Sequence, residues 1–234
     1  MENIKDANKQ FWKDLWKWKR ENKQICALYD TFGPNYDQFM SIDKSQFKAN
    51  KEVAQMLLLA LEGNTEANII DIACGTGLTG VALSEKGFKN IDGIEGSQGM
   101  LKMALEKNIH NHIFQMLLGE EDISQKISAG SYDAAVSVGE ITANSITIED
   151  FLRDVTRLVR HGGYAVYTVY DTHLDQSNPV DDEKPFHFME VHTEYMRNKL
   201  IDLISVQQMP YYEMLGANDA KKTLLAYVFT IRIR

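Results

Sequence analysis

A glycine-rich run is the part of this sequence that most clearly carries chemistry. Gly75, Gly77 and Gly80 stand at G-x-G-x-x-G spacing in the run D-I-A-C-G-T-G-L-T-G, which follows a short isoleucine-rich stretch. In such a loop, backbone N–H groups and the start of the next helix can approach an anionic part of a ligand closely. Glu95 ends the next apolar stretch, where a carboxylate can accept hydrogen bonds from both hydroxyls of an adenosyl ribose. The spacing therefore indicates a site for an adenosine-containing ligand.

Asp71 helps to distinguish which adenosine ligand this is. It lies four residues before Gly75, where a carboxylate would repel a pyrophosphate but would suit a cationic amino-acid head group. Two other functions for a protein with this loop stay open. One is a nicotinamide-dependent oxidoreductase that uses the same loop, and the other is a non-catalytic protein that binds the adenosyl ligand and docks a partner.

The elements that must position these residues alternate along the chain. Apolar runs of strand type are followed by stretches with helical periodicity, which predicts βαβ units and a mostly parallel sheet covered by helices on both faces. Two final runs with strand character, separated by G-A-N-D-A-K-K, predict a C-terminal antiparallel hairpin at one sheet edge. The expected strands are 68–73, 90–95, 112–118, 132–138, 164–170, 200–211 and 224–233, and the expected helices are 46–61, 78–87, 98–107 and 148–159.

Composition limits the class of protein. The 234 residues include 25 basic and 33 acidic side chains, a formal net charge of −8, so the summed positive field that drives binding to nucleic-acid phosphates is missing. We therefore expect no nucleic acid partner. Cys26 and Cys74 are the only cysteines and fit neither a disulfide framework nor a thiolate zinc site. Neither a signal peptide nor an apolar run long enough to span a membrane is seen, so we expect a cytoplasmic protein.

The ordered motifs resemble those of the class I S-adenosylmethionine-dependent methyltransferases. The resemblance covers roughly residues 29–170 and rests on D-I-A-C-G-T-G, G-I-E-G-S-Q-G-M-L, L-L-G-E-E, S-Y-D-A-A-V-S-V and L-V-R-H-G-G-Y. The runs at 29–38 and 136–142 are most similar to a methyltransferase-like protein within that class. The resemblance implies a Rossmann-like fold with a seven-stranded sheet, S-adenosylmethionine as cofactor with S-adenosylhomocysteine as product, and methyl transfer as the reaction.

The same resemblance implies which residues bind the cofactor. The backbone of the glycine loop would run close beside the methionine moiety of the cofactor. Asp71 would organise the loop and the ammonium group of the cofactor, and Glu95 would bind the ribose. Glu120 stands where the family usually has an aspartate near the adenine, and Tyr29 and Tyr36 match an N-terminal lid. The full expected set is Tyr29, Tyr36, Asp71, Ala73, Cys74, Gly75, Thr76, Gly77, Glu95, Gly96, Ser97, Met100, Glu120, Glu121 and Val138. Packing aromatics explain the two tyrosines as well as a lid does.

The acceptor side is less specific. We expect a helical segment and lid at 1–46, a methyltransferase domain at 47–234, and an acidic insertion or acceptor-side loop at 171–198. No catalytic residue is assigned; the candidate bases are Glu140, His173, His187 and His192. No metal site is expected, and the absence of an N-P-P-Y-type run argues against DNA base methylation. Lysines alternate with aromatic side chains over residues 1–24, which fits either partner contact or a docked helix.

Overall fold

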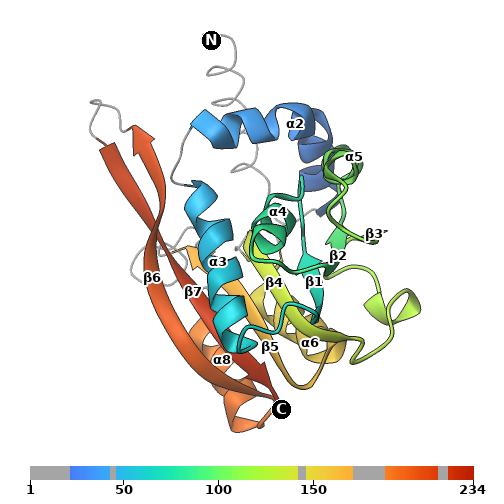
Figure 1. Cartoon of the computed structure of the whole chain (residues 1–234), viewed down its shortest axis with the longest axis vertical. Coiled ribbons are helices and arrows are strands. Elements are labelled where there is room, and N and C mark those ends of the chain that lie inside the picture. Colours follow the sequence, from blue (N-terminus) through green and yellow to red (C-terminus); the bar gives the residue numbers. More distant parts are fainter. Residues whose placement is uncertain (1–21, 43–45, 142–145, 171–187, 216–220) are drawn as a thin grey trace.

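The structure is a computed structural model of the whole chain, and it describes residues 22–42, 46–141, 146–170, 188–215 and 221–234. A seven-stranded sheet with the order β3-β2-β1-β4-β5-β7-β6 forms its centre (Figure 1). β1 to β5 pair in parallel, whereas β7 pairs antiparallel with both β5 and β6. This is the Rossmann-like fold with a C-terminal antiparallel hairpin that the sequence predicts.

The bounds of most elements agree with the predicted ranges. The strands are β1 (Asn68–Ile72), β2 (Asn90–Glu95), β3 (Ile113–Gln115), β4 (Tyr132–Ile141), β5 (Val159–Tyr170), β6 (Ile201–Leu215) and β7 (Lys221–Ile233). The helices are α2 (Asn22–Ile42), α3 (Gln46–Ala60), α4 (Leu78–Glu85), α5 (Gln98–Lys107), the short 3₁₀ helix η1 (Ile123–Gln125), α6 (Ile148–Leu158) and α8 (Phe188–Arg197).

The sheet has a separate core on each face. Ile69 and Ile70 are neighbours in β1 and both fully buried, but they belong to different cores, because successive side chains of a strand point to opposite faces. α3 and α4 supply the core that contains Ile69, and α6 and α8 supply the core that contains Ile70. Burial on both faces explains why the parallel strands read as continuous apolar runs.

Two elements differ from the sequence prediction. α8 lies within the segment that we expected to be irregular, 171–198, and it buries Phe188 and His192. Residues 171–187 of that segment lie outside the described residues. β3 is only three residues long, shorter than the predicted 112–118, because its neighbour β2 pairs with it over three positions alone.

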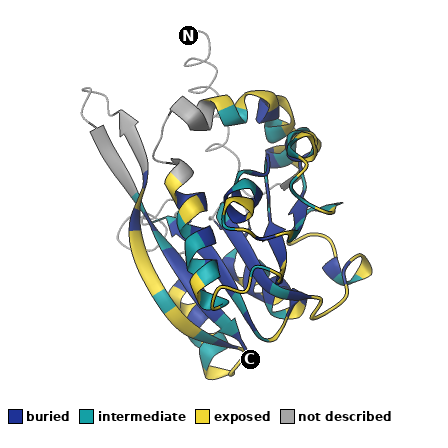
Figure 2. Ribbon diagram, in the orientation of Figure 1, coloured by how far each residue is buried: buried dark blue, intermediate teal, exposed yellow. Residues whose placement is uncertain are grey.

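The hairpin of β6 and β7 leaves β6 at one edge of the sheet. Leu203, Ile204 and Val206 on β6 are exposed, and the outer side of this strand is mostly exposed in Figure 2. Register shifts interrupt β6 near Ser205 and Pro210; such irregularities and an edge proline hinder pairing with another chain. Among the described residues, no helix has both the length and the apolar character needed to cross a bilayer.

Candidate active site

The loop after β1 has the geometry that the glycine spacing predicts. Ala73, Gly75 and Gly77 have φ of 55°, 56° and 89°, in the left-handed region that glycine adopts most readily. Gly77 N–H donates to the Cys74 carbonyl at 2.8 Å, which closes a tight turn directly before α4. A β-carbon at Gly75 would have no atom within 4 Å, so there is free space beside this backbone for a ligand.

Glu95 at the end of β2 faces this loop. Its Oε2 accepts from Gly75 N–H at 2.8 Å, and its Oε1 accepts from Ser97 N–H at 2.7 Å. The residue is 8% exposed. Burial raises the pKa of the Glu95 carboxyl to about 7, although the hydrogen bonds from Ser97 and Gly75 act in the opposite direction. The predicted ribose-binding carboxylate and the glycine loop are therefore in direct contact.

Asp71 has a partner that the sequence analysis missed. Its Oδ2 lies 3.1 Å from Nε2 of His110, and both side chains are almost completely buried. The imidazole occupies the space next to Gly80, whose β-carbon would come within 2.6 Å of it. Burial raises the pKa of Asp71, and the hydrogen bond from His110 opposes that shift. No sequence motif links His110 to the loop, so only the fold brings the two together.

The second oxygen of Asp71 tests whether the loop suits a cationic ligand. Oδ1 is buried and makes no well-aligned hydrogen bond among the described residues, although the Gly80 backbone also acts on this carboxyl and lowers its pKa. A buried polar atom is normally paired. Burial raises the pKa of the Cys74 thiol, and the charges of Asp71 and Glu95 raise it further, so the two carboxylates flank one short stretch of loop. An ammonium group at Asp71 Oδ1 and ribose hydroxyls at Glu95 would fit S-adenosylmethionine.

Helix α2 covers this loop by means of two aspartates. Asp30 Oδ1 accepts from Ser97 Oγ at 2.6 Å and from Gly99 N–H at 2.9 Å, at the start of α5. Asp37 accepts from Thr76 Oγ1 at 2.5 Å. Lys107 Nζ lies 2.5 Å from the other oxygen of Asp37. These contacts place α2 over the glycine loop and α5 at the carboxyl ends of β1 and β2 (Figure 1).

The close crossing of α2 and α5 depends on glycine. A β-carbon on Gly33 would lie 2.9 Å from the Gly99 carbonyl carbon, and one on Gly99 would overlap the backbone of Asp30. Near Gly96, the Sγ of Cys26 from α2 and the side chain of Leu117 lie about where a β-carbon would point. Burial raises the pKa of Cys26 to about 12, with further contributions from Glu95, Glu140, Asp30 and Glu120. The charges of these four carboxylates therefore all act on the Cys26 thiol of α2.

The two tyrosines predicted to form a lid belong to a group of four tyrosines. Tyr29 and Tyr36 of α2 have ring centroids 6.4 Å apart, and Tyr170 and Tyr211 meet edge to face at 4.7 Å. Burial raises the pKa of Tyr36 well above its ordinary value, and the neighbouring Tyr29, Tyr211 and Glu140 raise it further. The structure thus brings the predicted lid residues together with the ends of β5 and β6.

The remaining predicted site residues have mixed placements. Ser97 caps α5 by accepting from the Met100 N–H at 3.2 Å, and Met100 is buried. Val138 packs against the core that contains Ile69. Glu121 is exposed, accepts from Leu117 N–H and pairs with Lys126, so it closes a turn, and this geometry gives no support for its predicted role at the adenine.

Of the candidate bases, Glu140 alone lies near the site among those described. His192 is fully buried, and its Nε2 is hydrogen-bonded to the Tyr167 hydroxyl. Burial lowers the pKa of His192 to about 4, so it acts as a packing residue. His173 and His187 lie outside the described residues. Residues 1–21, most of the segment predicted to contact a partner, lie outside them too.

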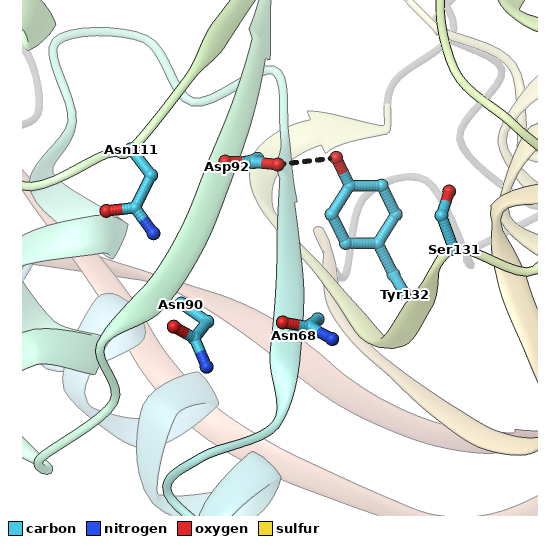
Figure 3. Close-up of a pocket in the computed structure, with 6 residues that line it drawn as sticks. All are labelled: Asn68, Asn90, Asp92, Asn111, Ser131 and Tyr132. Carbon is cyan, nitrogen blue, oxygen red and sulfur yellow. Dashed lines mark hydrogen bonds between the residues drawn. The ribbon is translucent and has the colours of Figure 1, made fainter.

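A polar depression of about 310 Å³ lies at the amino ends of β1, β2 and β4, away from the glycine loop (Figure 3). Tyr132 donates there to Asp92 at 2.8 Å, and Asp92 also accepts from His112 N–H. Asn68, Asn90 and Tyr132 begin their strands, whereas ligands of open parallel sheets bind at the carboxyl ends. This depression is therefore not the candidate active site. Within the described ranges, no cluster of histidine, cysteine and acidic side chains could hold a metal ion.

Comparisons with known proteins show which chains this one resembles. Residues 69–163 match the family described as a methyltransferase domain. The chain is 32% identical to human methyltransferase-like protein 27 over 124 residues, which are 53% of this chain and 49% of the relative. The chain spans about half the length of the curated relatives it matches.

Solved structures share the fold at low identity. An S-adenosylmethionine-dependent methyltransferase of Thermotoga maritima matches with a TM-score of 0.57 at 17% identity, covering 88% of this chain and 97% of the other. The [4+2]-cyclase SpnF matches with a TM-score of 0.68 at 13% identity, covering 92% and 98%, so the fold alone does not fix the reaction. Together with the family match, these findings support a class I S-adenosylmethionine-dependent methyltransferase, with S-adenosylmethionine as its cofactor, over the two alternatives.

The comparisons correct one expectation. No nucleic acid partner was expected because of the net charge, but three relatives, from Arabidopsis thaliana, Bos taurus and Mus musculus, are named 18S rRNA (guanine-N(7))-methyltransferases. The first is 27% identical over 157 residues, 63% of this chain and 53% of the relative. Net charge sums over the whole surface, whereas contact with RNA depends on the field close to the site. The exclusion was therefore wrong.

Proposed function

We propose that this chain transfers a methyl group from S-adenosylmethionine to an acceptor bound beside Glu140, at the carboxyl ends of β4 and β5. The observation that carries the proposal is the contact of Glu95 with Gly75 and Ser97 beneath α2. When bound, the cofactor supplies a methyl group on a positively charged sulfur. The family match at 69–163 and the relatives' names support the same activity.

The chain's own residues have distinct roles in this proposal. Glu95 accepts hydrogen bonds from the ribose hydroxyls, and Asp71 Oδ1 accepts one from the ammonium group, which gives this buried oxygen the well-aligned partner it lacks among the described residues. The backbone N–H groups of the loop lie alongside the methionine end of the cofactor, next to Gly75. α2 excludes water and holds donor and acceptor together, which is the largest contribution a protein makes to such a displacement.

The acceptor belongs to the proposal too. The relatives named for guanine-N(7) methylation of 18S rRNA support an RNA base as the methyl acceptor. The alternative acceptor is a small molecule or a protein group. The runs at 29–38 and 136–142 support a particular likeness to the methyltransferase-like protein of the Williams-Beuren syndrome region. A cytoplasmic location remains a prediction.

Calorimetric titration tests the cofactor directly. We expect S-adenosylmethionine and S-adenosylhomocysteine to bind and NADH to give no heat, because Asp71 would face the pyrophosphate of NADH. Incubation with a radiolabelled methyl donor and separate pools of RNA, protein and metabolites then shows which pool is labelled. Absence of binding by both adenosyl ligands would remove the proposal.

A further inference from the structure

We propose that Tyr29, Tyr36, Tyr170, Tyr211 and Glu140 form an acceptor site for an uncharged nitrogen that becomes positively charged on methylation. The inference rests on the proposed function and specifies the substrate class of the same site. The residues come from α2, from the carboxyl ends of β4 and β5, and from β6. They are far apart in sequence, so only the fold assembles them.

The first step is the geometry around the end of β4. Gly139 has a φ of 81°, and a β-carbon there would lie 2.6 Å from the Tyr211 hydroxyl and 3.4 Å from that of Tyr170. Both hydroxyls therefore reach the backbone directly before Glu140, and only glycine leaves them room. Tyr170 and Tyr211 stand edge to face at 88°, so their ring faces point in different directions.

The second step places α2 on the other side. Tyr29 and Tyr36 are tilted by 63° to one another. Burial raises the pKa of the Tyr29 phenol, and Glu140, Glu95 and Tyr211 raise it further. The Tyr170 phenol is affected in the same direction by burial and by its three tyrosine neighbours. Tyr170 and Tyr211 lie beside the backbone that precedes Glu140, and the effects of Glu140 and Tyr211 on Tyr29 and Tyr36 indicate that α2 faces the same group. All four phenols are uncharged at neutral pH.

The third step is accessibility. Tyr29, Tyr36, Tyr170 and Glu140 are half-buried rather than fully enclosed, and Tyr211 is buried. Cys26, three residues before Tyr29 on α2, has its Sγ 3.0 Å from where a β-carbon on Gly96 would stand, so this part of α2 lies beside Glu95 and the proposed cofactor site. An acceptor that entered here would meet aromatic faces and a carboxylate close to the methyl donor.

The chemistry of that environment selects the acceptor. Aromatic faces attract cations, and a nearby carboxylate strengthens the attraction. When an uncharged nitrogen attacks, its lone pair forms the new C–N bond, the C–S bond breaks with its electrons staying on sulfur, and the positive charge passes from sulfur to nitrogen. The site then stabilises the charge where it develops in the transition state. A hydroxyl acceptor would instead need to lose a proton and would end uncharged.

Two sources supply such a nitrogen, an alkylamine and the N7 of a guanine base, and paired ligands distinguish them. We would titrate protein saturated with S-adenosylhomocysteine with choline against its uncharged isostere 3,3-dimethyl-1-butanol, and with 7-methylguanosine against guanosine. In at least one pair, we expect the cation to bind about tenfold tighter than its uncharged partner. The preferred pair identifies the source.

Variants test whether the proposed acceptor site causes the preference for the cation. Glu140→Gln and Tyr170→Leu should reduce the preference for the cation to about threefold or less, whereas Tyr170→Phe keeps most of it because it keeps the ring face. Glu106→Gln, on the exposed side of α5, is the matched control and should change nothing. Melting temperature and affinity for S-adenosylhomocysteine show that each variant folds.

The outcomes separate the two proposals. Failure to bind S-adenosylhomocysteine would contradict the proposed function. Normal binding of that ligand without preference for either cation, or a preference that survives Glu140→Gln and Tyr170→Leu, would overturn the acceptor inference alone.

Discussion

At the residue scale, the buried carboxyl group of Glu95 couples ligand binding to pH. Its pKa is raised to about 7 by burial, so between its ordinary pKa and pH 7 the folded state holds a proton that the unfolded state has lost. This residue's contribution to the free energy of unfolding therefore falls as pH rises through that range. The ionised form, which accepts the ribose hydroxyls, predominates only above pH 7.

We therefore predict that affinity for S-adenosylhomocysteine rises about tenfold between pH 6 and pH 8. Glu95→Gln should bind more weakly, by roughly 10- to 100-fold at pH 8, and should flatten this pH dependence. Calorimetric titration of both proteins across this range measures the effect. An equally steep profile in Glu95→Gln would show that another group is responsible.

His110 offers a second prediction at this scale. His110→Ala removes the partner of Asp71 and leaves a cavity under the glycine loop, so the free energy of unfolding should fall by about 2 to 4 kcal/mol. His112 is exposed, and His112→Ala should cost less than about 0.5 kcal/mol. Urea denaturation compares the two, and equal losses would contradict a specific role for the buried pair.

At the element scale, Gly33 and Gly99 let α2 and α5 pack closely where they cross. Gly99→Ala places a methyl group against the backbone of Asp30, so α2 should shift away at a cost of about 1 to 3 kcal/mol. We expect faster amide exchange in α2 and weaker binding of S-adenosylhomocysteine. Lys102→Ala, on the exposed side of α5, serves as the control, and unchanged exchange in Gly99→Ala would show that the crossing tolerates a side chain.

Elements with strong local patterns were predictable from the sequence. The isoleucine-rich run of β1, the turn at Gly75 and the helical periodicity of α5 all carry their structure locally. α8 was not predicted, because the residues before it in the sequence, 171–187, include two prolines and several acidic side chains that obscured its short apolar pattern. β3 was overestimated, since an apolar run does not reveal how far its neighbour pairs with it.

Some residues of the candidate site were likewise predictable from the sequence, and others were not. Asp71, Gly75 and Glu95 follow from motif spacing, and the structure brings them together. His110, Asp30, Asp37, Tyr170 and Tyr211 carry no motif, and they reach the site only through tertiary contacts. The charge argument against nucleic acid failed for a related reason, because a sum over the chain says nothing about where the charges lie.

At the scale of the whole molecule, the hairpin shapes one edge of the sheet. Ile204 on β6 is 52% exposed, and Ile204→Lys should leave the free energy of unfolding within about 0.5 kcal/mol of the parent. A lysine on an edge strand discourages pairing between copies, so self-association at high concentration should fall. Analytical ultracentrifugation measures this, and a large loss of stability would show that Ile204 is packed.

The two aspartate contacts of α2 have a kinetic consequence. A product that lies between the glycine loop and α2 can depart only after the contacts of Asp30 with α5 and of Asp37 with Thr76 and Lys107 have opened. Opening several contacts together is slower than breaking any one of them. We therefore predict that escape of S-adenosylhomocysteine, rather than methyl transfer itself, limits the rate of repeated catalytic cycles, which a burst of methylated product in the first cycle would reveal.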